Sequence, residues 1–212
     1  MGNFKKSFPQ WEHLKIGITG ANGSLGRALT KTLRNKGAFV IGLTSQNIDN
    51  SNNSNQTPNQ WIKWKCGEEE KLDKTLKVLD IIILNHGINH QGFLSNNEIN
   101  ESLEINSLST WRLINRFEMI SKLQEQKSSP REIWVNTSEA EIQPALSPIY
   151  EISKRLIGQL VTLKWSRDNK NKTSNLKIRK IVLGPFRSEL NPIGIMNAEL
   201  VANQIIKQVE MK

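Results

Sequence analysis

Tyr150 and Lys154 are the residues of this chain whose types and spacing best suit proton transfer. They are four positions apart, so on a helix their side chains lie on one face. A free tyrosine has a pKa near 10 and is a poor base at neutral pH, but a neighbouring ammonium group favours the phenolate and lowers that pKa. Ser138, which follows an apolar run, could hold and polarise a substrate carbonyl. The same spacing is common on helices whose side chains only pack, so the spacing alone does not indicate catalysis. The catalytic interpretation is strengthened because Tyr150 is the only tyrosine in the chain.

A second group of residues suits phosphate binding and lies near the start of the chain. An apolar stretch runs through Gly20, Gly23 and Gly26 into a helical pattern. A diphosphate needs close backbone amides and the positive end of a helix, and side chains would obstruct both. The alternative is a purely structural turn between a strand and a helix. We predict a dinucleotide site that includes Gly20, Asn22, Gly23, Ser24, Leu25 and Gly26.

The end of the second expected strand bears on the choice between NAD and NADP. An acidic residue there would bind the adenosine ribose and repel a 2′-phosphate. The chain has Thr44 and Ser45 at this place and no carboxylate before Asp49. Hydroxyl groups do not repel a phosphate, so we expect NADP to be preferred over NAD, although no arginine stands beside them.

The elements that must position these residues follow an alternating pattern. Short apolar runs alternate with longer helical patterns, which predicts an α/β fold, a Rossmann-like three-layer sandwich around a mostly parallel six-stranded sheet. The expected strands are Leu14–Thr19, Phe39–Leu43, Trp61–Cys66, Leu79–Leu84, Glu132–Asn136 and Ile178–Leu183. The expected helices are Leu25–Lys36, Glu69–Val78, Glu98–Glu125, Pro148–Ser166 and Ala198–Met211.

The length of 212 residues suits one domain, so we expect residues 1–212 to form a single nucleotide-binding unit. Residues 1–13 would be an N-terminal extension, and the Asn- and Ser-rich residues 49–60 a flexible loop. The single cysteine, Cys66, excludes an intrachain disulfide, and no apolar run approaches the length of about 18 residues that spans a membrane. We therefore expect a cytoplasmic protein.

Charge and metal-ligand spacing argue against two further classes of site, although the charge alone does not decide the first. The net charge of +9 raises the question of a polyanionic partner, but the basic residues are spread over several expected helices. We expect no nucleic-acid partner, and a cofactor's phosphates would suit a basic protein equally. His13, His86 and His90 have no ligand spacing with one another or with Cys66, so we expect no metal site.

From about Leu14 to the C-terminus, the order of these motifs resembles the short-chain dehydrogenase/reductase family. That resemblance implies a catalytic set of Asn106, Ser138, Tyr150 and Lys154. In such a set Asn106 organises a proton-relay water, Tyr150 transfers the proton at the substrate oxygen, and Lys154 also binds the nicotinamide ribose.

The resemblance also implies further contacts with the cofactor. The turn after the fourth strand would support the nicotinamide side, and Gly184–Ser188 would close on the ring. Glu68 stands where an acidic residue often meets the adenine, although a solvated helix start is an equal alternative. The implied contacts are Asn85, His86, Gly87, Gly184, Pro185, Phe186 and Ser188.

Several departures from the family pattern leave the function open. The glycine spacing resembles the extended branch, which includes sugar-nucleotide epimerases, and Leu84 replaces the first asparagine of the strand-four motif. The helices that normally cover the substrate are nearly absent after Phe186, and a final strand is missing, so we expect a shortened C-terminal end. We therefore expect an open active site and an altered oligomer interface in any homo-oligomer.

The leading prediction is an NAD(P)-dependent oxidoreductase that transfers hydride between nicotinamide and a small carbonyl or alcohol compound. A cofactor-binding scaffold or redox sensor without catalysis is one alternative, and a sugar-nucleotide epimerase is another. Relatives fused to a sterol-desaturase-like domain also make a membrane or lipid-linked partner conceivable.

Overall fold

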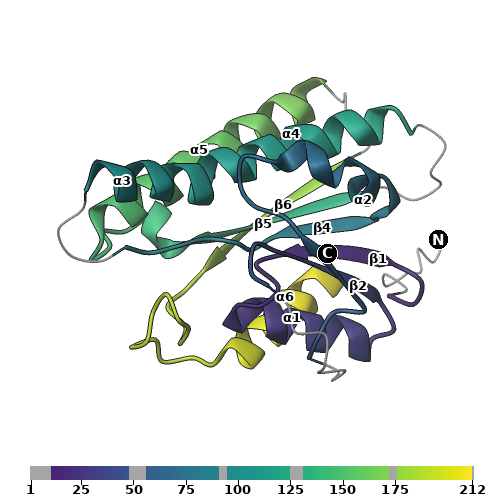
Figure 1. Cartoon of the computed structure of the whole chain (residues 1–212), viewed down its shortest axis with the longest axis horizontal. Coiled ribbons are helices and arrows are strands. Elements are labelled where there is room, and N and C mark those ends of the chain that lie inside the picture. The colour runs from purple at the N-terminus through teal and green to yellow at the C-terminus, as the bar shows by residue number, and fades with distance from the viewer. Residues whose placement is uncertain (1–10, 48–55, 91–94, 125–130, 172–175, 212) are drawn as a thin grey trace, which may run out of the picture.

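The computed structural model describes residues 11–47, 56–90, 95–124, 131–171 and 176–211 (Figure 1). The expected N-terminal extension lies outside these residues up to residue 10, and so do residues 48–55 of the expected Asn- and Ser-rich loop.

Six strands form one sheet in the order β3-β2-β1-β4-β5-β6, and every adjacent pair is parallel. Their bounds are β1 Lys15–Thr19, β2 Phe39–Thr44, β3 Gln60–Lys63, β4 Ile81–Leu84, β5 Glu132–Ser138 and β6 Lys177–Leu183. Strands β2 and β3 follow β1 on one side of the sheet, and the chain then crosses to the other side of β1, where β4 pairs with it. Such a reversal opens a crevice at the carboxyl ends of β1 and β4, where ligands bind in folds of this kind.

Helices cover both faces of the sheet (Figure 1). The α-helices are α1 Ser24–Asn35, α2 Asp73–Val78, α3 Asn96–Leu103, α4 Ser109–Lys122, α5 Pro148–Asn171 and α6 Ala198–Glu210. Short segments of other helical types are η1 Glu69–Leu72, η2 Glu104–Leu108 and η3 Glu139–Glu141. One apolar core lies between the sheet and the pair α1 and α6, and a second lies on the opposite face beneath α2, α4 and α5.

The central strands are apolar because both of their faces are covered. All four residues of β4 are buried, so this strand contributes to both cores. The predicted α/β sandwich with a six-stranded sheet is thereby confirmed, and the sheet is parallel throughout the described strands.

The helix expected at Glu98–Glu125 is divided, and this is the largest local difference from the sequence prediction. Helix α3 begins at Asn96 because Ser95 forms a reciprocal capping box with Glu98. A π-helical turn, η2, then separates α3 from α4. Asn106 and Ser107 in this turn bond to Ser153 on α5, so polar contacts with a neighbouring helix accompany the wider turn.

Several other bounds differ by a few residues. β3 ends at Lys63, β4 begins at Ile81, β5 ends at Ser138 and α5 continues to Asn171. The helix expected from Glu69 begins there, but as the 3-10 turn η1. In the part of the chain that the structure describes, no helix is both long enough and apolar enough to cross a bilayer.

Candidate active site

The glycine turn lies directly after β1 and is packed against the loop that follows β4. Gly20 has a φ of +62°, a conformation that residues with a Cβ seldom adopt. A Cβ on Gly20 would lie 2.9 Å from the Cα of His86, and a Cβ on Gly26 would lie 2.2 Å from the carbonyl oxygen of Gly20. Both positions therefore require glycine.

Helix α1 begins at this turn with an N-terminus that has no side-chain cap. Its N-cap residue is Gly23, so the amides of the first turn are available to an acceptor. Glu189 supplies one, since its Oε2 accepts from the amide of Ser24 at 3.3 Å and from Ser24 Oγ at 2.6 Å. Its Oε1 lies 3.0 Å from Nη2 of Arg27. The hydrogen bond from Ser24 is the main reason that the pKa of Glu189 is lowered to about 2.

These features fit a bound dinucleotide. The turn is built from glycines that no larger residue can replace, and the helix end already holds a carboxylate, which shows that it accepts an anion. In the described residues, no group of three or more His, Cys, Asp or Glu is arranged to hold a metal ion.

The loop after β4 is fixed to β1 and β5. Thr19 Oγ1 accepts from the amides of Asn85 at 2.8 Å and His86 at 3.3 Å, and Asn136 donates to Oδ1 of Asn85 at 2.9 Å. The structure thus brings the predicted Asn85-His86-Gly87 turn beside the glycine turn, at the carboxyl ends of β1 and β4.

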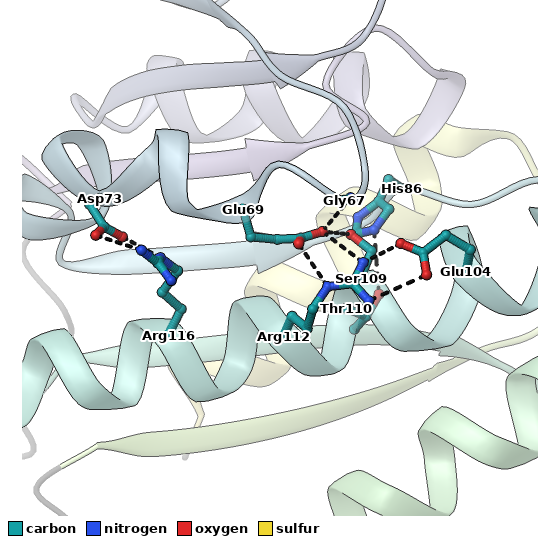
Figure 2. A network of polar contacts seen from close by, with 9 residues as sticks. All are labelled: Gly67, Glu69, Asp73, His86, Glu104, Ser109, Thr110, Arg112 and Arg116. Atoms are coloured by element: carbon teal, nitrogen blue, oxygen red, sulfur yellow. Dashed lines mark hydrogen bonds and ion pairs between the residues drawn. The ribbon is translucent and has the colours of Figure 1, made fainter.

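The His86 side chain points into the layer between the sheet and α4 (Figure 2). Its Nδ1 lies 2.8 Å from Thr19 Oγ1, its Nε2 lies 3.5 Å from Thr110 Oγ1, and Trp64 packs against the ring edge to face. Burial, together with the nearby Lys154 ammonium, lowers the pKa of His86 to about 3. The ring is therefore neutral near pH 7.

Two of the four predicted catalytic residues, Asn106 and Lys154, lie beside Gly87, and Lys154 connects them to Tyr150. Asn106 accepts from the amide of Ile88 at 2.8 Å and donates to the Ile88 carbonyl at 3.0 Å. A Cβ on Gly87 would lie 3.0 Å from Asn106 Oδ1 and 3.4 Å from Lys154 Nζ. Lys154 is buried, and its Nζ lies 5.5 Å from the centre of the Tyr150 ring. A cation, a phenol and an amide therefore share one place next to the cofactor crevice.

Ser138, the fourth predicted residue, ends β5 and so lies at the same edge of the sheet. In the described part of the chain its Oγ accepts from the Ala140 amide at 3.2 Å and makes no hydrogen bond to Tyr150. Ser138 is thus less closely connected to Tyr150 than Lys154 is.

The residues predicted for the adenosine side lie at the ends of β2 and β3. Thr44 is buried and its Oγ1 accepts from the Gln46 amide at 3.2 Å, while Ser45 is exposed. Asn22 of the glycine turn donates to the Gln46 side chain, which joins this strand end to the turn. Glu68 lies at the surface with Lys71 at 2.9 Å and Lys65 at 3.8 Å.

The segment predicted to close on the nicotinamide folds back on itself after β6. The amide of Arg187 donates to the Met196 carbonyl at 2.8 Å, and Ser188 and Asn191 exchange backbone hydrogen bonds at 3.1 Å. Asn89 donates to the Leu190 carbonyl at 3.2 Å, so the segment is tied to the loop after β4. Phe186 packs against the core beneath α1, whereas Gly184 and Pro185 are exposed.

An ion-pair network around the buried Glu69, which the sequence analysis missed, lies next to the site (Figure 2). Arg112 on α4 contacts Glu69 on η1, with Nε 2.7 Å from Oε2, and also Glu104 on η2. Ser109 and the amide of Gly67 donate to the same Glu69 carboxylate at 2.7 and 3.0 Å.

Glu69 is only 3% exposed, and it remains charged because of its partners. Burial raises its pKa, but the hydrogen bonds from Arg112 and Ser109 outweigh that effect and leave the pKa below its usual value. Glu69 and Arg112 are 43 positions apart, so no local pattern could have revealed the pair. The network joins η1 to the π turn that carries Asn106.

Comparison with known proteins gives a family match over most of the chain. Residues 16–189 match the model of the NAD dependent epimerase/dehydratase family. Over 198 residues the chain is 41% identical to the monoglucosyldiacylglycerol epimerase of Synechocystis sp. (strain ATCC 27184 / PCC 6803 / Kazusa), an alignment that covers 92% of this chain and 47% of that protein. The chain thus spans about half the length of this curated relative.

Solved structures agree on the fold. A short-chain dehydrogenase from Burkholderia cenocepacia J2315, in complex with NADP, has a TM-score of 0.78 and 16% identity over 95% of this chain and 86% of its own. A short-chain dehydrogenase from Leptospira borgpetersenii serovar Hardjo-bovis (strain JB197), with bound NAD+, has a TM-score of 0.77 and 19% identity over 97% and 88%. The expected resemblance to short-chain dehydrogenases is thereby confirmed for the fold.

Proposed function

Since this chain belongs to the NAD-dependent epimerase/dehydratase family, we propose that it binds a nicotinamide dinucleotide and inverts a hydroxyl-bearing carbon of a sugar. The observation that carries the proposal is the cluster of Tyr150, Lys154 and Asn106 at the loop after β4, which itself packs against the glycine turn. The 41% identity to a glycolipid epimerase supports the choice of reaction.

The chain's own residues bind the cofactor and move a proton. Gly20 and Gly26 leave the turn open to the diphosphate, and the first amides of α1 bind it. Lys154 stabilises negative charge on the Tyr150 oxygen and is held under the loop after β4. Asn106 fixes the backbone of Ile88 in that loop. When bound, nicotinamide supplies the acceptor and donor of hydride.

In an epimerisation, Tyr150 takes the proton of the sugar hydroxyl while its carbon loses a hydride and becomes a ketone. The ketone has to turn over in the site so that the hydride returns to the opposite face of that carbon, and Tyr150 then gives the proton back to the oxygen. The carbon is inverted and no cofactor is consumed. Ser138, at the end of β5, holds the substrate oxygen during both steps.

We propose a lipid-linked sugar as the substrate class. Four aliphatic side chains are largely exposed on the two loops after β5 and β6: Ile142 at 68%, Leu146 at 96%, Ile193 at 78% and Ile195 at 91%. Both loops are bonded to the loop after β4, through Ser147 with the His90 carbonyl and through the Leu190 carbonyl with Asn89. Acyl chains would cover such aliphatic groups while the sugar enters the site.

We also propose that NADP is preferred over NAD. The end of β2 carries Thr44 and Ser45 and has no carboxylate as far as Asn47, so nothing there repels a 2′-phosphate. The single cysteine, Cys66, suits the cytoplasmic location that we propose with it.

The direct test is an assay with monoglucosyldiacylglycerol in mixed micelles, with NAD+ or NADP+ added. The product headgroup is identified by chromatography, and the nicotinamide absorbance is followed in the same samples. An inverted sugar without accumulation of reduced cofactor is the expected result. Reduced cofactor in amounts equal to the product would instead establish a net oxidoreductase, the second candidate, which the Ser138, Tyr150, Lys154 and Asn106 set favours. Cofactor binding without turnover would reject both and leave a scaffold.

A further inference from the structure

Helix α1 presents an anion site that the chain fills with a carboxylate of its own. We propose that Glu189 occupies the diphosphate subsite of the cofactor, that the cofactor must displace it, and that Arg27 then passes from Glu189 to the phosphates. The inference rests on the proposed function in so far as it takes the ligand to be a dinucleotide.

The position of the carboxylate identifies the subsite. Glu189 Oε2 contacts both the amide and the hydroxyl of Ser24, the first residue of α1. Those are groups that a phosphate oxygen would use, since the helix begins at Gly23 without a side-chain cap and its positive end faces the ligand. A carboxylate oxygen and a phosphate oxygen accept the same hydrogen bonds, so Glu189 stands in for the missing anion.

The two anions cannot share the subsite. A phosphate placed on Ser24 would meet the ionised Glu189 at contact distance, where like charges repel. Glu189 can leave this place because its side chain is 62% exposed, and in the described residues its carboxylate is held by Ser24, Arg27 and its own backbone amide. Cofactor binding is therefore an exchange of one anion for another.

Arg27 also takes part in the exchange, because it pairs with Glu189 before the cofactor binds and with the phosphate afterwards. One guanidinium nitrogen, Nη1, donates to the carbonyl of Asn22 in the glycine turn, which holds the group over the turn. The other, Nη2, holds Glu189 at 3.0 Å. When Glu189 leaves, Nη2 remains over the turn with a free donor for the incoming phosphate. Arg27 is thus a further cofactor-binding residue.

The exchange also reaches the segment expected to meet the nicotinamide. Glu189 follows Ser188 within the turn that Ser188 and Asn191 close, and Leu190 is tied to Asn89 in the loop after β4. Displacing Glu189 therefore releases one of the contacts that hold this turn against α1.

The test measures binding rather than turnover. Dissociation constants of ADP-ribose, NAD+ and NADP+ are determined by titration calorimetry for the full chain, Glu189→Gln and Arg27→Gln. ADP-ribose has the diphosphate but no nicotinamide, so it reports on this subsite. Glu189→Gln removes the competing charge, so it is expected to lower the dissociation constants of all three ligands by about tenfold, which corresponds to about 1.4 kcal/mol. Arg27→Gln is expected to weaken binding.

Glu199→Gln is the matched control. Glu199 on α6 also forms an exposed ion pair with α1, through Lys31 at 2.8 Å, but lies away from the glycine turn. It should leave the dissociation constants unchanged. Equal constants for the unmodified chain and Glu189→Gln, with both folded by circular dichroism, would overturn the inference alone. Failure of every variant to bind any of the three ligands would overturn the proposed function with it.

Discussion

The cofactor side and the substrate side of the candidate site are built in opposite ways. Around Gly20 and Gly26 the backbone segments lie so close together that a single Cβ would collide with a neighbour, and at Gly87 it would press on the side chains of Asn106 and Lys154. Around Leu146 and Ile195 the side chains are more than nine-tenths exposed. The first region is determined by contacts within the chain, whereas the second faces solvent, where the acyl chains that we propose would cover it. The fold therefore specifies the chemistry more firmly than it specifies the substrate.

Replacing the proton-transfer group should have the largest effect. Tyr150→Phe removes the hydroxyl and leaves the ring beside Lys154, so turnover should fall by about 10²- to 10⁴-fold. The dissociation constant of the cofactor should stay within about twofold, since the glycine turn is untouched. Steady-state rates and titration calorimetry measure the two effects. Arg155→Gln, an exposed change on the same helix, is the control, and full turnover by Tyr150→Phe would refute the assigned role.

The second-largest effect is expected from a side chain placed in the glycine turn. In Gly26→Ala the new methyl group would lie 2.2 Å from the Gly20 carbonyl oxygen and 2.7 Å from the Cα of Ala21, so the backbone has to move. We expect a loss of about 1–3 kcal/mol of unfolding free energy together with loss of cofactor binding. Urea denaturation and calorimetry provide the measurements.

Gly158→Ala is the comparison for this change. Its methyl group would meet only the side chain of Glu141, whose far end can move, and alanine is a better helix former than glycine. Its stability should change little. Equal losses for both variants would contradict the claim that the turn depends on backbone contact.

The buried imidazole predicts a dependence of stability on pH. Burial lowers the pKa of His86 from 6.5 to about 3, so below pH 6.5 the unfolded chain binds a proton that the folded chain does not. The free energy of unfolding therefore carries no penalty from His86 above pH 6.5. It decreases as the pH falls from 6.5 toward 3, with a slope of at most about 1.4 kcal/mol per pH unit. Urea titrations across this range should show a shallower slope for His86→Gln. An unchanged slope would mean that His86 is protonated in the folded protein.

The smallest effect belongs to the exposed aliphatic residues. Leu146→Ser and Ile195→Ser should each alter the unfolding free energy by less than about 0.5 kcal/mol, because both side chains already face solvent. Each should raise the KM for a glycolipid several-fold and leave kcat unchanged. The same KM increase with a water-soluble glucoside would exclude the acyl chains as the cause.

Much of the cofactor side could be predicted because its requirements are local. Gly20 and Gly26 lie within one strand-turn-helix unit, and Tyr150 and Lys154 lie one helical turn apart. The apolar runs predicted the sheet for the same reason, since a strand buried on both faces has no polar positions.

The remaining features depend on pairs that are distant in sequence. Glu189 is 165 positions from Ser24, and Glu69 is 43 positions from Arg112. Neither pair has a periodic pattern or a motif, and each acquires its meaning only when two elements pack. The π turn at Glu104–Leu108 is of the same kind, because its polar side chains bond to another helix and to a distant loop.

The Arg112 network also bears on the order in which the protein matures on the ribosome. Glu69 is synthesised 43 residues before Arg112, so β1, β2, β3 and η1 emerge while the counter-ion of Glu69 is still to be made. A buried carboxylate without its partner is costly. Ser109 and Arg112, which donate to this carboxylate, both lie on α4. We therefore expect Glu69 to stay solvated in the nascent chain until α4 has been translated and packs over it.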